Sequence, residues 1–235
     1  MDTTLICIGG GELKDRTTLK IDEYIAAKAK ARAGERRANA LFLPTASHDF
    51  MPYYNTFHKV YTGQFDIKTD VALCAFREAD MARMQEKFAK ADMIYAGGGD
   101  TVFMMNRWRE TGILPLIEDA YNRGVILCGL SAGAICWFSD IYTDSATCGD
   151  GEKYSMYKGL GWIKGKISPH YGARMVDFDK IMCYNNGIAY GAEDNSALVL
   201  ENGKVIGAVS SGGTVWKIVS ENGVLKKEKV PLLRE

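Results

Sequence analysis

The chain has 235 residues, of which 47% are hydrophobic and 25% charged, and its 29 basic and 29 acidic residues give a formal net charge of zero. This composition is ordinary for a globular protein, and the length suffices to bury a large core. The balanced charge disfavours nucleic acid or a membrane surface as a partner, and no apolar run is long enough to span a bilayer. Because no basic-then-apolar leader opens the chain, we expect a cytoplasmic protein.

Cysteine and histidine are too scattered to indicate disulfides or metal ligation. The six cysteines form no Cys-x-x-Cys pair, and several lie in apolar strand-like segments, so we expect reduced, mostly buried thiols. The three histidines, at positions 48, 58 and 170, lack metal-ligand spacing with cysteine or with one another. We therefore expect neither a metal nor a cofactor.

Strand-like and helical segments alternate over the first 130 residues. The expected strands are Thr4–Ile8, Ala40–Leu43, part of Phe65–Leu73, Met93–Ala96 and Val125–Cys128. The expected helices are Ile21–Ala33, Tyr53–Tyr61, Ala79–Lys90, Val102–Glu110 and Leu114–Asn122. Such alternation favours a parallel sheet with helices on both faces, and the active site of such a sheet lies beyond the carboxyl ends of its strands.

The last third of the chain has a different pattern. A single helical stretch, Val176–Tyr184, is followed by short apolar runs at Ile188–Tyr190, Ala197–Leu200, Lys204–Val209, Val215–Val219 and the C-terminus. Asn-Gly pairs at 186–187, 202–203 and 222–223 separate these runs and favour hairpins. We expect antiparallel strands capping one edge of the parallel sheet, within a single domain covering residues 1–235.

The segment Gly129-Leu130-Ser131-Ala132-Gly133 is the most informative of the chain. It is a Gly-x-Ser-x-Gly pattern between an apolar strand and an apolar helix start at residues 132–138, which is typical of a nucleophile elbow. Its glycines permit a tight turn and a close approach of strand and helix. Ser131 would present its hydroxyl at the carboxyl edge of the sheet, and the Ala132 amide could stabilise an oxyanion.

A serine nucleophile needs a base. His170, which follows Ser168-Pro169, is the one histidine downstream of Ser131 and is the first candidate. His48 lies at the end of another expected strand and is the second candidate. His58 lies within an amphipathic helical stretch, so we expect a structural role for it.

The base in turn needs an orienting carboxylate, and spacing alone does not select one. Glu193 and Asp194 stand out because they follow Gly191-Ala192 at the end of a short apolar strand. The downstream candidates are Asp140, Asp144, Asp150, Glu152, Asp177, Asp179, Glu193 and Asp194.

A second set of backbone donors is expected in Gly97-Gly98-Gly99-Asp100, which follows an apolar strand and precedes a helix. Amides free of side chains beside a helix N-terminus suit an oxyanion or another anion. The alternative is a nucleotide phosphate loop, but the chain has neither Gly-x-Gly-x-x-Gly nor the P-loop Gly-Lys-Ser/Thr.

The combination of these motifs resembles the peptidase E family, which contains alpha-aspartyl dipeptidases and is related to cyanophycinases. The resemblance runs from position 9 to about 198 and is carried by Pro44–Ser47, Tyr95–Thr101, Gly129–Ala134, Pro169-His170 and Ala192–Leu198. It implies a three-layer α/β sandwich with a mostly parallel sheet, like the class I glutamine amidotransferases and flavodoxin-like folds.

The resemblance also implies a serine peptidase that forms an acyl-enzyme and releases small N-terminal units, often with aspartate first. Its implied triad is Ser131, His170 and Glu193, with Asp144 as an alternative acid, and its implied oxyanion hole is formed by the amides of Gly98, Gly99 and Ala132. The basic residues that could receive an acidic substrate side chain include Arg174, Lys158 and Lys164.

Three other functions are weighed against a dipeptidase. An esterase-type hydrolase shares the elbow, but the chain has no histidine near its C-terminus. A cysteine amidotransferase would need cysteine at the elbow, whereas Cys128 and Cys136 lie in the expected strand and helix around it. The third is a catalytically inert protein that binds a small anion. The expected partner is a small peptide, and exposed apolar edge strands make a homodimer possible.

Overall fold

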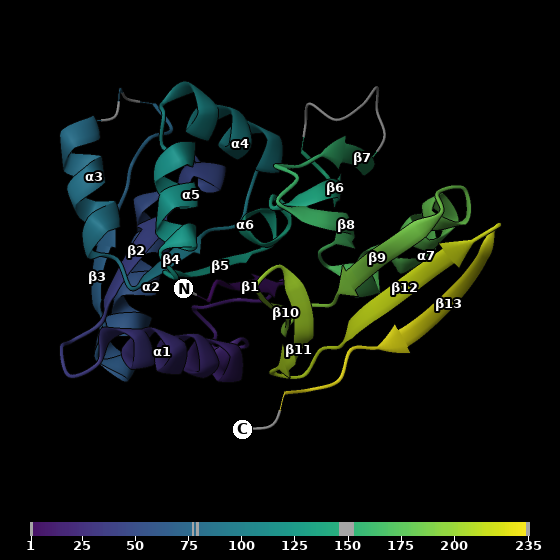
Figure 1. The fold of residues 1–235 in the computed structure, drawn as a ribbon, viewed down its shortest axis with the longest axis horizontal. Helices are drawn as coiled ribbons and strands as arrows, with labels where there is room; N and C mark the ends of the chain where they lie inside the picture. The colour runs from purple at the N-terminus through teal and green to yellow at the C-terminus, as the bar shows by residue number, and fades with distance from the viewer. Residues whose placement is uncertain (1, 77, 79, 146–152, 234–235) are drawn as a thin grey trace.

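The computed structural model describes residues 2–76, 78, 80–145 and 153–233, which form two β-sheets and their covering helices (Figure 1). The strands are β1 (Thr4–Ile8), β2 (Asn39–Leu43), β3 (Lys68–Val71), β4 (Met93–Ala96), β5 (Ile126–Leu130), β6 (Phe138–Thr143), β7 (Ser155–Lys158), β8 (Ile163–Ser168), β9 (Gly187–Ala192), β10 (Ser196–Glu201), β11 (Lys204–Ser210), β12 (Val215–Glu221) and β13 (Val224–Lys229). The α-helices are α1 (Leu19–Ala33), α2 (Met51–Phe65), α3 (Met81–Lys90), α4 (Thr101–Glu110), α5 (Leu114–Asn122), α6 (Ala132–Ile135) and α7 (Tyr171–Cys183), and η1 (Thr45–Ser47) is a 3-10 turn.

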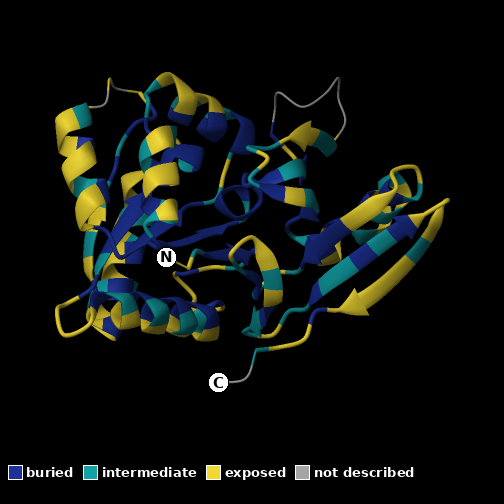
Figure 2. Ribbon diagram, viewed as in Figure 1, coloured by how far each residue is buried: buried dark blue, intermediate teal, exposed yellow. Residues whose placement is uncertain are grey.

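The first sheet has the order β11-β10-β1-β5-β4-β2-β3. The strands β1, β5, β4, β2 and β3 run parallel to one another. Helices α1 and α2 pack on one face against Ile6, Phe42 and Cys128, while α3, α4 and α5 pack on the other face against Leu5, Leu41 and Ile94. The exposed residues of these helices point outward and the central strands are buried (Figure 2). The expected three-layer α/β arrangement with a mostly parallel sheet is confirmed.

The C-terminal strands divide between two sheets, which differs from the expectation of a single cap. Strands β10 and β11 do extend the edge of the first sheet: β10 pairs antiparallel with β1, and β11 pairs antiparallel with β10 through the expected turn at 202–203. Strands β9, β12 and β13 instead join a second sheet of order β13-β12-β9-β8-β6-β7. The pair at 186–187 is not a hairpin, because β9 follows α7 and runs parallel to β8.

The apolar stretch after Ser131 is likewise not one helix. Helix α6 ends at Ile135, and Phe138 opens strand β6. The reason lies in the second sheet, where Phe138 and Ile141 join the core of the first sheet together with Ile163 and Ile167 of β8. Burying these side chains between the sheets outweighs the helical preference of the local sequence.

Among the described residues, no helix combines the length and the apolar character that crossing a bilayer would require. The longest, α1 and α2, have 15 residues each.

The elbow depends on close backbone contact between β4, β5 and α6. A Cβ atom on Gly133 would lie 2.1 Å from the carbonyl oxygen of Ala96, and one on Gly129 would lie 2.4 Å from the carbonyl oxygen of Gly133. These contacts are with backbone atoms, which cannot rotate away. Both glycines are therefore required by the packing of strand against helix, as the sequence indicates.

We predict that Gly133→Ala lowers the free energy of unfolding by about 2–3 kcal/mol, because the added methyl forces α6 away from β4. The matched control is Gly63→Ala in α2, where a Cβ atom would meet nothing within 4 Å. That change should stabilise the protein by about 0.5–1 kcal/mol. Urea unfolding followed by circular dichroism measures both, and equal effects of the two substitutions would contradict this account.

A buried carboxylate joins α1 to α2 behind the parallel sheet. Asp22 is 1% exposed and accepts hydrogen bonds from the hydroxyls of Thr18 (2.7 Å) and Tyr61 (2.8 Å). Burial raises the pKa of Asp22 from the ordinary value of 3.8 to about 6, although the two hydrogen bonds act in the opposite direction.

This raised pKa makes stability depend on pH. Between pH 4 and 6 the folded protein holds a proton on Asp22 that the unfolded chain has lost, so this contribution falls as pH rises. From pH 4 to pH 7 it should decrease by about 2 kcal/mol, at 1.36 kcal/mol per unit of pKa shift, because part of the contribution is already lost at pH 4. The unfolding free energy of wild type minus that of Asp22→Asn should show this fall in urea titrations across that range, and a difference independent of pH would refute it.

Candidate active site

Ser131 lies at the carboxyl end of β5, next to the end of β1. Leu130 is paired with Ile8 in the parallel register, and the Ser131 amide donates to the Ile8 carbonyl oxygen at 2.9 Å. The backbone of Ser131 has φ 51° and ψ −106°, a conformation that non-glycine residues rarely adopt. This strained turn presents the hydroxyl above the sheet edge, as expected of a nucleophile elbow.

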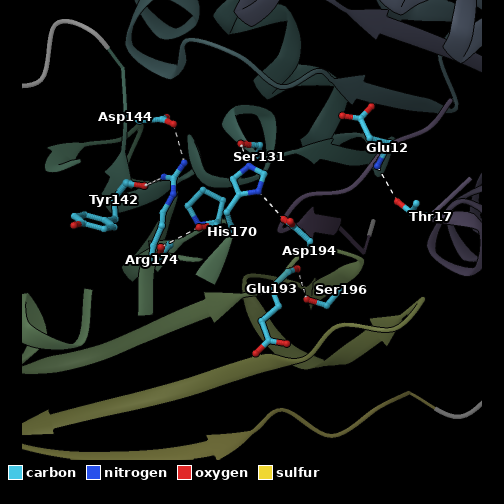
Figure 3. Close-up of polar contacts among 12 residues, drawn as sticks. Glu12, Thr17, Ser131, Tyr142, Asp144, His170, Arg174, Glu193, Asp194 and Ser196 are labelled. Atoms are coloured by element: carbon cyan, nitrogen blue, oxygen red, sulfur yellow. Dashed lines mark hydrogen bonds and ion pairs between the residues drawn. The ribbon is translucent and has the colours of Figure 1, made fainter. Parts of the chain in front are cut away.

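His170 approaches Ser131 from the second sheet. It follows β8 and precedes α7, in a left-handed conformation with φ 49° and ψ 38°. Its amide donates to the Gly9 carbonyl oxygen at 2.9 Å, which fixes this turn against the end of β1. The imidazole Nε2 then lies 2.9 Å from Ser131 Oγ, which is hydrogen-bonding distance (Figure 3).

The carboxylate beside His170 belongs to Asp194. Asp194 Oδ1 lies 2.6 Å from His170 Nδ1 (Figure 3). A continuous chain of polar contacts thus runs from Ser131 through His170 to Asp194. The His170 side chain is 31% exposed and that of Asp194 is 57% exposed, so the acid lies at the rim of the site.

The prediction of Glu193 as the partner of His170 is wrong in this structure. The Glu193 carboxylate accepts hydrogen bonds from the Thr214 amide (3.0 Å) and from Trp216 Nε1 (2.9 Å), so it faces β12. Glu193 directly continues β9, and neighbouring side chains of an extended segment point to opposite sides. Asp194, one position later, therefore points toward His170.

The alternative acid, Asp144, is also placed elsewhere. Its Oδ2 atom accepts from Arg174 Nη2 at 3.0 Å, and Arg174 donates to the Tyr142 carbonyl oxygen and lies over the Tyr154 ring. Arg174 is 4% exposed, so its pairing with Asp144 offsets the cost of burying its charge. Neither residue contacts His170 through a side-chain hydrogen bond among the described interactions.

The glycine-rich loop after β1 provides the space for this constellation. A Cβ atom on Gly10 would lie 2.0 Å from Asp194 Oδ1 and 2.5 Å from His170 Nδ1. Any side chain at this position would displace the imidazole or the carboxylate. The sequence contains this signal, because Gly9-Gly10-Gly11 follows the first strand without a dinucleotide fingerprint.

The expected oxyanion donors flank Ser131. A Cβ atom on Gly98 would lie 3.5 Å from Ser131 Cβ, so this loop packs directly on the elbow. The Gly98 amide donates to the Tyr53 hydroxyl in a long contact of 3.4 Å, and burial raises the pKa of Tyr53 to about 12, which keeps the phenol neutral. Ala132 is the first residue of α6, where an amide has no acceptor within its own helix.

A cleft of about 630 Å³ opens above Ser131 and His170. Its charged residues besides His170 are Glu12 and Lys14, from the loop between β1 and α1. Of the three basic residues considered for an acidic substrate side chain, none lines this cleft: Arg174 pairs with Asp144, Lys158 with Asp140, and Lys164 lines a different hollow. The full lining is Gly11, Glu12, Leu13, Lys14, Phe50, Pro52, Tyr53, Thr56, Gly98, Gly99, Leu130, Ser131 and His170.

The other nucleophile and base candidates lie outside the site. His48 stacks against Phe76 and contacts the tilted ring of Phe103, and His58 on the exposed side of α2 contacts Thr69 of β3. Cys128 and Cys136 are fully buried, and burial raises their pKa values well above the ordinary thiol value. Cys148 lies outside the described residues. Within the part of the chain that the structure describes, no three His, Cys, Asp or Glu side chains are grouped as a metal site.

Comparisons with known proteins identify the family of the chain. The family model of peptidase family S51 matches residues 5–207. YgaJ of Bacillus subtilis (strain 168), an uncharacterized peptidase, is 29% identical over 233 residues, which cover 95% of each chain. PM1590 of Pasteurella multocida (strain Pm70), also an uncharacterized peptidase, is 31% identical over 97 residues, 40% of this chain and 46% of the relative.

Solved structures show the same fold. A crystal structure of a peptidase from an acI-B1 actinobacterium has a TM-score of 0.75 at 18% identity, covering 100% of this chain and 96% of that one. A candidate peptidase E protein from Listeria monocytogenes EGD-e has a TM-score of 0.64 at 20% identity, covering 89% and 99%. Because the family model spans most of the sequence, including the segments that carry Ser131, His170 and Asp194, the chain belongs to peptidase family S51.

Proposed function

We propose that the protein is a cytoplasmic serine peptidase that hydrolyses short peptides through Ser131, His170 and Asp194. The observation that carries this proposal is the chain of contacts from Ser131 Oγ to His170 Nε2 (2.9 Å) and from His170 Nδ1 to Asp194 Oδ1 (2.6 Å). It has the order of a nucleophile, a base and an orienting acid. The buried, unpaired thiols suit a reducing compartment.

In the proposed mechanism, Ser131 Oγ attacks the scissile carbonyl carbon while His170 Nε2 takes the hydroxyl proton. Asp194 accepts the Nδ1 proton in a hydrogen bond, which holds the productive tautomer and stabilises the imidazolium. His170 then protonates the leaving amine, and an acyl-enzyme forms on Ser131. A water molecule, deprotonated by His170, hydrolyses this ester and restores the serine.

The amides of Gly98, Gly99 and Ala132 are the proposed donors to the oxyanion. Removing one such donor costs on the order of 100- to 1000-fold in rate. In this arrangement the oxyanion of the tetrahedral intermediate accepts a hydrogen bond from the Gly98 amide, either together with the Tyr53 hydroxyl or in its place. Since that contact is 3.4 Å long, exchanging it for a charged acceptor favours the transition state.

We further propose that the enzyme releases small N-terminal units, as the resemblance to peptidase E implies. In the cleft, Glu12 is an acceptor suited to a free α-ammonium group, and Lys14 is a cation suited to an aspartate side chain. A catalytically inert anion-binding protein would not need the strained Ser131 backbone or the aligned His170–Asp194 pair, so the geometry favours turnover.

Ser131 should react as an activated nucleophile. Incubation with a small fluorophosphonate should give one adduct by intact-mass spectrometry, located on Ser131, because the adjacent imidazole activates this hydroxyl. Ser131→Ala should form no adduct and should lose cleavage of Asp-Xaa dipeptides by at least about 1000-fold. Cleavage that survives in Ser131→Ala and is abolished by thiol alkylation would refute the proposal.

Substitutions of Asp194, Glu193 and Asp144 should have different effects on activity and stability. Asp194→Asn should lower kcat by about 1000- to 10,000-fold, because an amide partner favours the wrong imidazole tautomer. Glu193→Gln should lower kcat by less than about tenfold while lowering stability, because Glu193 bonds to β12. The matched control is Asp144→Asn, which neutralises the carboxylate that pairs with Arg174. Steady-state kinetics with thermal unfolding of each variant distinguishes them, and a larger kcat loss in Glu193→Gln than in Asp194→Asn would contradict this assignment.

A further inference from the structure

A second hollow adjoins the active-site cleft and is lined by unpaired cations. Its volume is about 610 Å³, and its charged lining residues are Lys14, Arg16 and Lys59. All three are exposed, and no described carboxylate lies within ion-pair distance of any of them. Asp15 lies between two of them in sequence but does not line the hollow. The remaining lining residues are Thr56, Val60, Gly63 and Gln64.

The hollow and the cleft lie side by side and share lining residues. Lys14 and Thr56 line both, and one face of α2 runs along the two, with Tyr53 in the cleft and Lys59 in the hollow. Lys59 follows Tyr53 by six positions in the helix, which corresponds to about 9 Å along the axis. An extended peptide covers about 3.3–3.6 Å per residue, so this distance corresponds to about three residues.

The charge changes along this path. Glu12 and Lys14 lie together at the cleft end, whereas the hollow contains three cations and no acid. Three neighbouring cations repel one another unless an anion lies between them, and carboxylates are the anions that peptides carry. The lysine and arginine side chains here are free to pair, since none is engaged by the described part of the protein.

We infer that this hollow is a subsite for substrate carboxylates, so that the enzyme prefers peptides bearing acidic residues about three positions from the bond that it cleaves. This inference rests on the proposed peptidase function and extends it from a dipeptide site to a longer groove. Arg16 and Lys59 act as specificity determinants, and they contribute through substrate binding without contacting the reacting atoms.

The turnover experiment uses amidated peptides in which a pair of glutamates, or a pair of glutamines, is moved one position at a time along a neutral chain. Mass spectrometry locates the bond cleaved. At low salt, wild type should show kcat/KM about tenfold higher for the glutamate peptide when the pair lies about three residues from that bond. The double variant Arg16→Gln/Lys59→Gln should reduce this preference to less than about twofold.

The matched control is Lys30→Gln/Lys180→Gln, which removes the same charge from exposed positions on α1 and α7 and should leave the preference unchanged. Sodium chloride at 0.5 M should abolish the preference in wild type, because exposed charge pairs are screened within a few ångströms at that ionic strength. Equal kcat/KM for glutamate and glutamine peptides at every position would overturn the inference.

A binding experiment separates this inference from the proposed chemistry. Isothermal titration calorimetry on Ser131→Ala should show about tenfold tighter binding of the glutamate peptide than of its glutamine counterpart, and Arg16→Gln/Lys59→Gln in that background should remove the difference. If wild type cleaves neither these peptides nor Asp-Xaa dipeptides, such binding would refute the peptidase proposal and retain the subsite. Free glutarate that competes as well as the acidic peptide would show a small-anion site and overturn the inference.

Discussion

The end of strand β1 is the point to which the segments carrying Ser131, His170 and Asp194 are attached. The Ile8 carbonyl oxygen accepts from the Ser131 amide, the Gly9 carbonyl oxygen accepts from the His170 amide, and the Gly10 carbonyl oxygen accepts from the Asn195 amide, next to Asp194. Three segments that lie far apart in sequence are thus held by consecutive peptide groups. Backbone hydrogen bonds of this kind fix position more tightly than side-chain contacts, because they move only with the strand.

The glycines that follow β1 allow these three segments to meet at the end of the strand. A Cβ atom on Gly9 would lie 2.4 Å from the Ala192 carbonyl oxygen, and one on Gly10 would overlap the Asp194 carboxylate. The glycines of this loop therefore do not form a phosphate cradle; they leave room for the side chains of His170 and Asp194. This use differs from a dinucleotide fingerprint, in which the glycines approach a bound ligand.

Much of this arrangement could be predicted from the sequence where the pattern was strong and local. The alternating strands and helices of the first 130 residues and the elbow at Ser131 were predicted, and the contact of His170 with Ser131 followed from the need for a base. The choice of Glu193 over Asp194 was wrong, because the acid that faces His170 depends on where β9 ends and on the tight turn through Asn195, whose φ is 62°. A shift of one residue reverses which carboxylate faces the imidazole.

The second sheet could not be predicted for a different reason. Strand β7 pairs with β6, β6 with β8, and β8 with β9, and pairing between separate segments leaves little local pattern. The residues after the elbow, Trp137 and Phe138, are apolar in either a helix or a strand. Only burial between the two sheets decides for the strand. The basic hollow was equally hidden, because Arg16 lies in the turn before α1 whereas Lys59 lies in α2, far away in sequence.

The attachment of the site to β1 also has a consequence for folding. Strand β1 pairs with β5, which lies more than a hundred residues later, and with β10, which lies later still. Contacts between such distant segments carry the largest loop-closure cost and form slowly. A newly made chain therefore has no assembled site until its C-terminal third has been synthesised and has docked onto its first strand. The hydrolytic centre is thus absent while most of the nascent polypeptide is still exposed, and catalytic competence coincides with completion of the fold.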